Sequence, residues 1–142
     1  MRVAVLNGVN LDVLERRDPQ LYGGLSLNQL ETRIYDWAKE LELNADCRQT
    51  NSEAEYVGWC HDAYDWAGGV IVNPGAWSHY SYAIHDALEV LQVPIVEVHL
   101  SNIEERPDLM TAMRLQLGLK MESGKAPVEV LVIDKVTKPT EN

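Results

Sequence analysis

The stretch VIVNPGAWSHYSYAIHDALEVLQVPIVEVHL, residues 70–100, decides the fold. It opens with a β-branched run at residues 70–73 and closes with PIVEVHL at residues 94–100. Near-continuous apolar runs of this kind are typical of strands that are covered on both faces. Residues 79–91 between them favour a helix. The stretch therefore predicts a strand, a crossover helix and a second strand parallel to the first.

The N-terminal part of the chain repeats this pattern. RVAVL at residues 2–6 is a short apolar run that predicts a buried strand. A helix is expected over residues 26–42, because Ser26 and Gln29 match a capping box and apolar residues recur at helical spacing. Those apolar residues are Leu27, Leu30, Ile34, Trp37 and Leu41.

A second strand is expected at ADCRQT, residues 45–50, and a second helix follows it. Ser52 and Glu55 again match a capping box, and the glycine pair at residues 68–69 is expected to end this helix. Its inner face is expected to hold Val57, Cys60 and Tyr64.

This alternation predicts an α/β fold, a three-layer flavodoxin-like parallel sheet in the strand order 2-1-3-4. VEVLVIDKV, residues 128–136, is expected to add a C-terminal edge strand or hairpin. A length of 142 residues is that of one domain. Residues 1–142 are therefore expected to form a single α/β domain.

Composition narrows the class of function. The net charge of -10 argues against a nucleic-acid partner, although an anionic substrate can bind where a few arginines meet in a cleft. No apolar run is long enough for a bilayer span or a signal peptide, so we expect no membrane partner and a cytoplasmic protein. Cys47 and Cys60 lack disulfide or zinc spacing and are expected to be buried, reduced thiols.

Polar segments follow each expected strand, at the edge where such sheets bind ligands. They contain Asn10, Asn73, His79 and His99. Each has a plainer interpretation: strand-end asparagines form turns, His79 at the start of the third helix can be a surface residue, and His99 can be a satisfied core histidine. Trp37, Trp59 and Trp66 are expected to be packing residues on their helices, whereas for Trp77 in NPGAWSH a place in the lining of a pocket or an interface is the alternative. No histidine pair has metal-ligand spacing, so no metal site is predicted.

The loop RRDPQLYGG, residues 16–24, has no helical or strand period. A positive charge on Arg17 beside Tyr22 would favour a phenolate, which is the basic form of tyrosine. Pro19 and the two glycines would let the loop close over a ligand. The loop is therefore either an activated phenolate on a lid or an exposed surface with no further role.

Together these segments resemble the type II 3-dehydroquinate dehydratases of the shikimate and quinate pathways. LNGVNLDVLERRDPQLYGG, RQTNSEAE, VNPGAWSHYSYAIHDAL and PIVEVHLSN carry the resemblance, which covers residues 1 to about 106. It implies a lyase of aromatic amino acid biosynthesis that converts 3-dehydroquinate into 3-dehydroshikimate and water. It also implies that no metal or cofactor is needed.

The resemblance implies a role for each matching residue. Tyr22 would remove a proton next to the ketone, and Arg17 would hold it as phenolate. Asn10 would hold a water that stabilises the enolate, and His99 would protonate the departing hydroxyl. The implied substrate-binding residues are Asn73, His79, Asp86, Leu100 and Ser101. Asp86 would reach a neighbouring subunit's site in a homo-oligomer that is built from trimers, usually a dodecamer.

The chain departs from this family after SNIEER, and Met110 stands where the spacing puts a substrate-clamping arginine. Arg106 and Arg114 lie nearby. Residues 107–142 resemble instead the tail of an uncharacterised protein family of soil bacteria, and are expected to be an exchanged C-terminal helix and strand.

Three functional hypotheses follow from these patterns. The first is an active or weakly active dehydratase. The second is a folded but catalytically silent chimera, or a structural or binding module. The third, a nucleotide- or flavin-binding protein, is weak because no glycine-rich phosphate loop follows the first strand.

Overall fold

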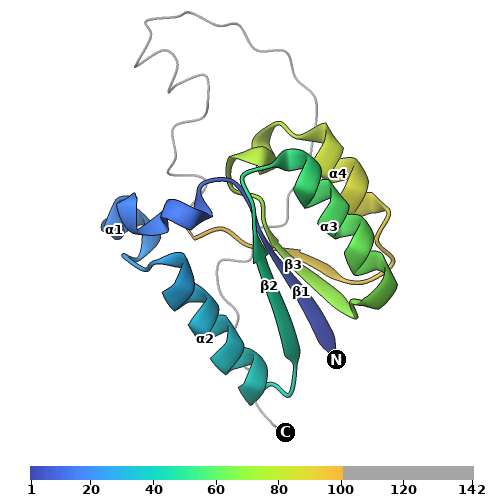
Figure 1. Cartoon of the computed structure of the whole chain (residues 1–142), viewed down its shortest axis with the longest axis horizontal. Coiled ribbons are helices and arrows are strands. Elements are labelled where there is room, and N and C mark those ends of the chain that lie inside the picture. The colour runs from blue at the N-terminus through green and yellow to red at the C-terminus, as the bar shows by residue number, and fades with distance from the viewer. Residues whose placement is uncertain (101–142) are drawn as a thin grey trace, which may run out of the picture. The chain divides into compact units, whose positions relative to one another are not determined.

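The computed structural model describes residues 1–100 of the chain, which form a parallel sheet with helices on its faces (Figure 1). The strands are β1 (Arg2–Asn7), β2 (Asn44–Gln49), β3 (Gly69–Asn73) and β4 (Ile95–Glu97). They are all parallel and lie in the order β2-β1-β3-β4. The flavodoxin-like order predicted from the sequence is therefore confirmed. The expected edge strand at residues 128–136 lies outside the described residues.

The helices cover the two faces of this sheet. The longer ones are α2 (Leu27–Glu40), α3 (Glu53–Trp66) and α4 (Tyr82–Glu89). Three shorter helices contain candidate site residues or lie next to them: the 3₁₀ helices η1 (Leu11–Arg16) and η2 (Gly75–His79), and the one-turn helix α1 (Pro19–Tyr22). In Figure 1, α2 lies on one side of the sheet, while α3 and α4 lie together on the other. None of the helices within residues 1–100 has the length and apolar character that a bilayer span requires.

Both expected helix starts are present. At α2 the Ser26 hydroxyl accepts from the Gln29 N–H and the Gln29 side chain accepts from the Ser26 N–H, which completes the capping box. At α3, Ser52 caps the Glu55 N–H at 3.4 Å, but the Glu55 carboxylate accepts from Thr50 instead. The second capping box is therefore only half formed.

The main apolar core lies under α3 and α4. Tyr56 is fully buried there, packs edge-on against Trp77 at 5.6 Å between ring centres, and donates to the Leu6 carbonyl at 3.0 Å. Burial raises the pKa of Tyr56 far above its ordinary value, so its hydroxyl stays protonated. Other buried members of this core are Ala4, Cys60, Ala63, Val70, Val72, Ile84 and Ala87.

Several expected packing positions are wrong. The buried stripe of α3 is Tyr56, Cys60 and Ala63, whereas Tyr64 is 52% exposed, because the helix is rotated so that position 64 falls at its margin. For Trp77 a place in the lining of a pocket or an interface was the alternative, but it is 5% exposed and belongs to the core. Trp37 was expected to pack, but it is 53% exposed on the outer side of α2.

Gly8 joins the ends of the two central strands. Its N–H donates to the Asn73 carbonyl at 2.8 Å, and a Cβ added at Gly8 would lie 2.4 Å from the Pro74 carbonyl oxygen. Only glycine permits so close an approach of two backbones. The loops that follow β1 and β3 are therefore fixed against each other at the carboxyl edge of the sheet.

Candidate active site

The carboxyl edge of the sheet gathers the loops that were predicted to bind a ligand. Backbone bonds link neighbouring strand ends across this edge: Thr50 N–H to Asn7 O at 3.1 Å, Gly8 N–H to Asn73 O at 2.8 Å, and Val98 N–H to Val72 O at 2.8 Å. Because the strands are parallel, the segments that carry Asn10, Asn73 and His99 all leave the sheet at this edge.

Arg17 and Tyr22 are in direct contact. The Arg17 Nη2 donates to the Tyr22 hydroxyl at 2.5 Å, and the Arg17 guanidinium carbon lies 4.4 Å from the centre of the Tyr22 ring. Both side chains are partly buried. The arginine therefore offers a hydrogen bond and a positive charge to the oxygen of this tyrosine.

The segment around this pair is more regular than expected. Residues 16–24 were expected to have no helix, yet α1 forms between Asp18 and Gly23. The Asp18 side chain caps α1 by accepting from the Gln20 N–H at 2.9 Å, and Gly23 ends it with a φ of 77°. A cap, a proline at the first helical position and a terminal glycine make one helical turn without an apolar period.

Asn10 leads from β1 into η1. Its backbone lies in the left-handed region, with a φ of 67°, and its side chain is exposed. The Asn10 N–H donates to the Asn51 Oδ1 at 2.8 Å. The amide side chain of Asn10 is thus held on a fixed backbone at the carboxyl edge of the sheet.

Asn73 and His79 differ in their surroundings. Asn73 is the last residue of β3 and is 5% exposed. His79 is exposed at the end of η2, so its expected position at the start of the third helix is wrong. The turn begins at Gly75, whose φ is 67°, and α4 starts only at Tyr82 after the Ser81 cap.

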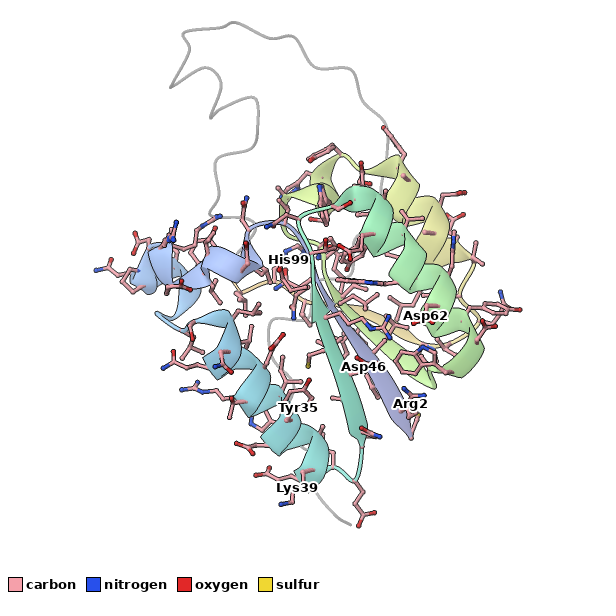
Figure 2. The ribbon with its side chains drawn as sticks, viewed as in Figure 1. Arg2, Tyr35, Lys39, Asp46, Asp62 and His99 are labelled. Atoms are coloured by element: carbon pink, nitrogen blue, oxygen red, sulfur yellow. The ribbon has the colours of Figure 1, made fainter. Side chains whose placement is uncertain are left out.

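His99 lies just beyond β4, at the carboxyl edge of the sheet in Figure 2. Its Nε2 lies 2.7 Å from the Glu97 Oε1, and the His99 side chain is only 9% exposed. Glu97 was not singled out from the sequence. A carboxylate two positions before a histidine on a strand was the available signal, because alternate strand residues share one face.

The remaining predicted site residues lie on other segments of the chain. Asp86 is exposed on α4, which Figure 1 shows on the opposite side of the carboxyl edge from α1. Leu100 is the last described residue and is half-buried. Ser101 and Met110 lie outside the described residues.

A second charged cluster lies between β2 and α3, and its charges are paired with one another (Figure 2). Arg48 binds Asp46 at 3.1 Å and Asp62 at 2.7 Å, and this arginine lowers the pKa of Asp62. The Trp66 Nε1 also donates to Asp62 at 3.2 Å. These contacts fasten α3 to the edge strand.

The cysteines are both free, Cys60 being buried and Cys47 only half-buried. The expectation that both are buried is therefore wrong for Cys47, which lies on β2, the first strand in the order β2-β1-β3-β4. Burial raises the pKa of Cys47 and the pKa of Cys60 to about 11. Among residues 1–100, no three His, Cys, Asp or Glu side chains are grouped as metal ligands.

Known proteins resemble this chain over the same segments. The family described as dehydroquinase class II matches residues 1–116. A 3-dehydroquinate dehydratase of Halalkalibacterium halodurans is 46% identical over 104 residues, which cover 73% of this chain and 72% of that protein. Another, of Pelobacter propionicus, is 46% identical over 108 residues, which cover 75% of this chain and 72% of the relative.

Solved structures agree with this family assignment. The crystal structure of a type II dehydroquinase from Propionibacterium acnes superposes with a TM-score of 0.72 at 47% identity. The alignment covers 75% of this chain and 74% of that one. The family match includes the β1 end, α1, the β3 end and β4, which form the edge described above. The chain belongs to the class II dehydroquinase family.

Proposed function

We propose that this protein dehydrates 3-dehydroquinate to 3-dehydroshikimate. Its family membership carries the proposal, since the curated relatives bear the name 3-dehydroquinate dehydratase. The Arg17–Tyr22 contact supports it independently of the family, because the reaction begins with removal of a proton next to a ketone.

Tyr22 is the base in this proposal. Its phenolate removes the proton from the carbon beside the ketone, and the electron pair of the C–H bond moves toward the carbonyl oxygen. Arg17 donates to the Tyr22 oxygen at 2.5 Å and places its positive charge beside it. The enolate oxygen then takes a hydrogen bond from a water that the Asn10 amide holds at the same edge.

His99 is the acid. When the enolate returns to a ketone, the neighbouring carbon expels its hydroxyl, and His99 donates a proton so that water leaves. The products are an enone and one water molecule. The Glu97 carboxylate lies 2.7 Å from the His99 Nε2 and supports this role by orienting the imidazole ring.

The substrate's carboxylate and hydroxyls are held by the remaining residues in this proposal. Asn73 is buried at the end of β3, where a rigid amide can fix a hydroxyl or carboxylate. His79, Leu100 and Ser101 are proposed to complete the substrate contacts.

We further propose that the chain works as a homo-oligomer built from trimers, a dodecamer if it follows the family pattern. Its support is the exposed position of Asp86 on α4, on the far side of the edge from α1 in Figure 1. An aspartate placed there serves the site of a neighbouring subunit more readily than its own. The molar mass in solution tests this proposal.

Residues 1–142 are proposed to form one α/β domain in which residues 107–142 are the exchanged C-terminal helix and strand. Support comes from the extent of the relatives' matches, which cover about three quarters of the chain. If the chain lacks the substrate-clamping arginine at whose place Met110 stands, it would fold but would not catalyse the dehydration.

The test is the appearance of the product enone by ultraviolet absorbance after 3-dehydroquinate is added to the full chain. The Tyr22→Phe variant is compared with Tyr64→Phe, since Tyr64 is an exposed tyrosine of α3 away from the carboxyl edge. Turnover in the wild type and Tyr64→Phe, but not in Tyr22→Phe, supports the proposal. A folded wild type without turnover contradicts it and favours the catalytically silent chimera.

A further inference from the structure

Asn51 fastens the segment after β1 to the end of β2. Its Oδ1 accepts from the Asn10 N–H at 2.8 Å, and its Nδ2 donates to the Asp12 Oδ2 at 2.8 Å. Asp12 lies in the first turn of η1, which leads directly to Arg17. The Asn51 side chain thus makes two hydrogen bonds to residues 10–17, accepting one and donating the other. This segment carries Asn10 and Arg17, which are both proposed to be catalytic.

Gln49 strengthens this connection from the last paired position of β2. Its Nε2 donates to the Gly8 carbonyl at 3.2 Å and to the Asn51 Oδ1 at 3.3 Å. Gln49 is also the register partner of Asn7 in the parallel ladder. The side-chain bonds therefore continue the cross-link between β1 and β2 after the ladder itself has ended.

The bond from Asn51 matters because Asn10 is held in an unusual backbone conformation. A φ of 67° is disfavoured for residues with a side chain, although asparagine tolerates it better than most. A hydrogen bond to the Asn10 N–H fixes the peptide plane that precedes its Cα. With φ fixed as well, the direction of the Cα–Cβ bond of Asn10 is determined.

We propose that Asn51 is a positioning residue, which sets the direction in which Asn10 presents its amide. This inference rests on the proposed function, in which that amide holds the water that faces the enolate oxygen. Asn51 touches no reacting atom. Negative charge on that oxygen develops in the transition state, so a misdirected amide lowers kcat much more than it changes KM.

The test exchanges donor and acceptor between positions 51 and 12. Asn51→Asp keeps an oxygen for the Asn10 N–H but sets a second carboxylate against Asp12, and we expect kcat to fall about tenfold with KM within about twofold. Asp12→Asn alone keeps the donor on Asn51 and an acceptor at position 12, so it serves as the control. The double variant restores one donor and one acceptor and is expected to recover kcat to within about threefold of the wild type.

Recovery in the double variant supports positioning when circular dichroism shows that Asn51→Asp is itself folded, because the loss of kcat is then traced to the contact between positions 51 and 12 and not to unfolding. A kcat of Asn51→Asp equal to that of the wild type would overturn the inference. It would also be overturned if the double variant is folded by circular dichroism but does not recover the kcat that Asn51→Asp loses.

A second readout does not depend on activity and separates this inference from the proposed function. The Asn10 amide is expected to exchange with deuterated solvent at least tenfold faster in Asn51→Ala than in the wild type, with Asp12→Asn close to the wild type. Equal exchange rates of the Asn10 amide in the wild type and Asn51→Ala would overturn the inference that Asn51 holds the Asn10 N–H, even in a chain without turnover. If the Asn10 amide is protected by Asn51 but the wild type has no turnover, the contact between Asn51 and Asn10 stands and only the proposed function is contradicted.

Discussion

The guanidinium of Arg17 both hydrogen-bonds the hydroxyl of Tyr22, at 2.5 Å, and lies 4.4 Å from the centre of its ring. These two contacts require a planar, charged group of some breadth, which arginine provides and lysine does not. Only four residues separate them, and the single helical turn α1, which is capped by Asp18 and ended by Gly23, brings the two side chains together.

Arg17→Lys is expected to lower kcat about ten- to a hundredfold, because an ammonium keeps the charge but loses the fork-shaped donor set and the ring contact. Arg16→Lys is the matched control, since Arg16 is an exposed neighbour at the end of η1. Steady-state kinetics on 3-dehydroquinate checks both variants. Equal kcat for the two would contradict a role of Arg17 at the phenol.

Glu97→Gln is expected to lower kcat about tenfold or more, because a hydrogen bond to a charged partner contributes about 1.5–3 kcal/mol. The His99 ring would keep a neighbour of the same size but lose the carboxylate that now lies 2.7 Å from its Nε2. Glu89→Gln, at the end of α4, is the control. Unchanged turnover in Glu97→Gln would remove Glu97 from the proposed mechanism.

Asp86→Asn is expected to be nearly inactive as a pure oligomer but to regain activity when it is refolded together with Tyr22→Phe. Mixed assemblies contain sites that combine an intact Tyr22 of one subunit with an intact Asp86 of the next. Each pure variant is the control for the mixture. Activity of the mixture no greater than the sum of the separate variants would mean that Asp86 does not act across an interface.

Tyr56→Phe is expected to destabilise the fold by about 1–2 kcal/mol, because the buried bond from its hydroxyl to the Leu6 carbonyl is lost. Tyr64→Phe should change the free energy of unfolding by less than about 0.5 kcal/mol, as for most exposed positions. Urea denaturation checks both values. A Tyr56→Phe protein as stable as the wild type would show that this bond is energetically neutral.

Stability is expected to fall in alkali, and Cys60 accounts for part of that fall. Burial raises the pKa of Cys60 to about 11, above its ordinary value of 9.0. Between these two pH values the folded state retains the Cys60 thiol proton, whereas the unfolded state releases it. The contribution of this thiol to the free energy of unfolding is therefore complete below about pH 9 and is lost as the pH rises toward 11.

The Cys60→Ala variant isolates this effect. Its free energy of unfolding should be lower at neutral pH because a cavity remains, but it should fall less steeply than that of the wild type between pH 9 and 11. Urea denaturation at several pH values measures both slopes. Identical slopes would assign the alkaline loss to other groups, such as Tyr56.

The parts of this structure that could be predicted from sequence are those set by local patterns. The strands, their order and the α2 cap follow from apolar runs and the Ser26–Gln29 spacing. The orientation of α3 could not be predicted, because Tyr56 and Tyr64 are both apolar enough to face the core and only packing decides between them.

Predicting the site had similar limits. Asn10, Arg17, Tyr22 and His99 could be singled out because each follows a strand or stands in a polar loop. The contacts made by Glu97 and Asn51 could not be, since they depend on where side chains meet after folding. The Asn51 bond to the Asn10 N–H joins residues 41 positions apart, a separation that no local pattern reports.

The central position of β1 also has a consequence for synthesis on the ribosome. β1 is made first, yet both of its edges are paired only with strands that begin at residues 44 and 69. At roughly 5–20 residues per second, the nascent strand waits several seconds for both neighbours. During that time its apolar run has neither of its partner strands, and an unpaired strand of this kind is where contacts with other nascent chains form most readily.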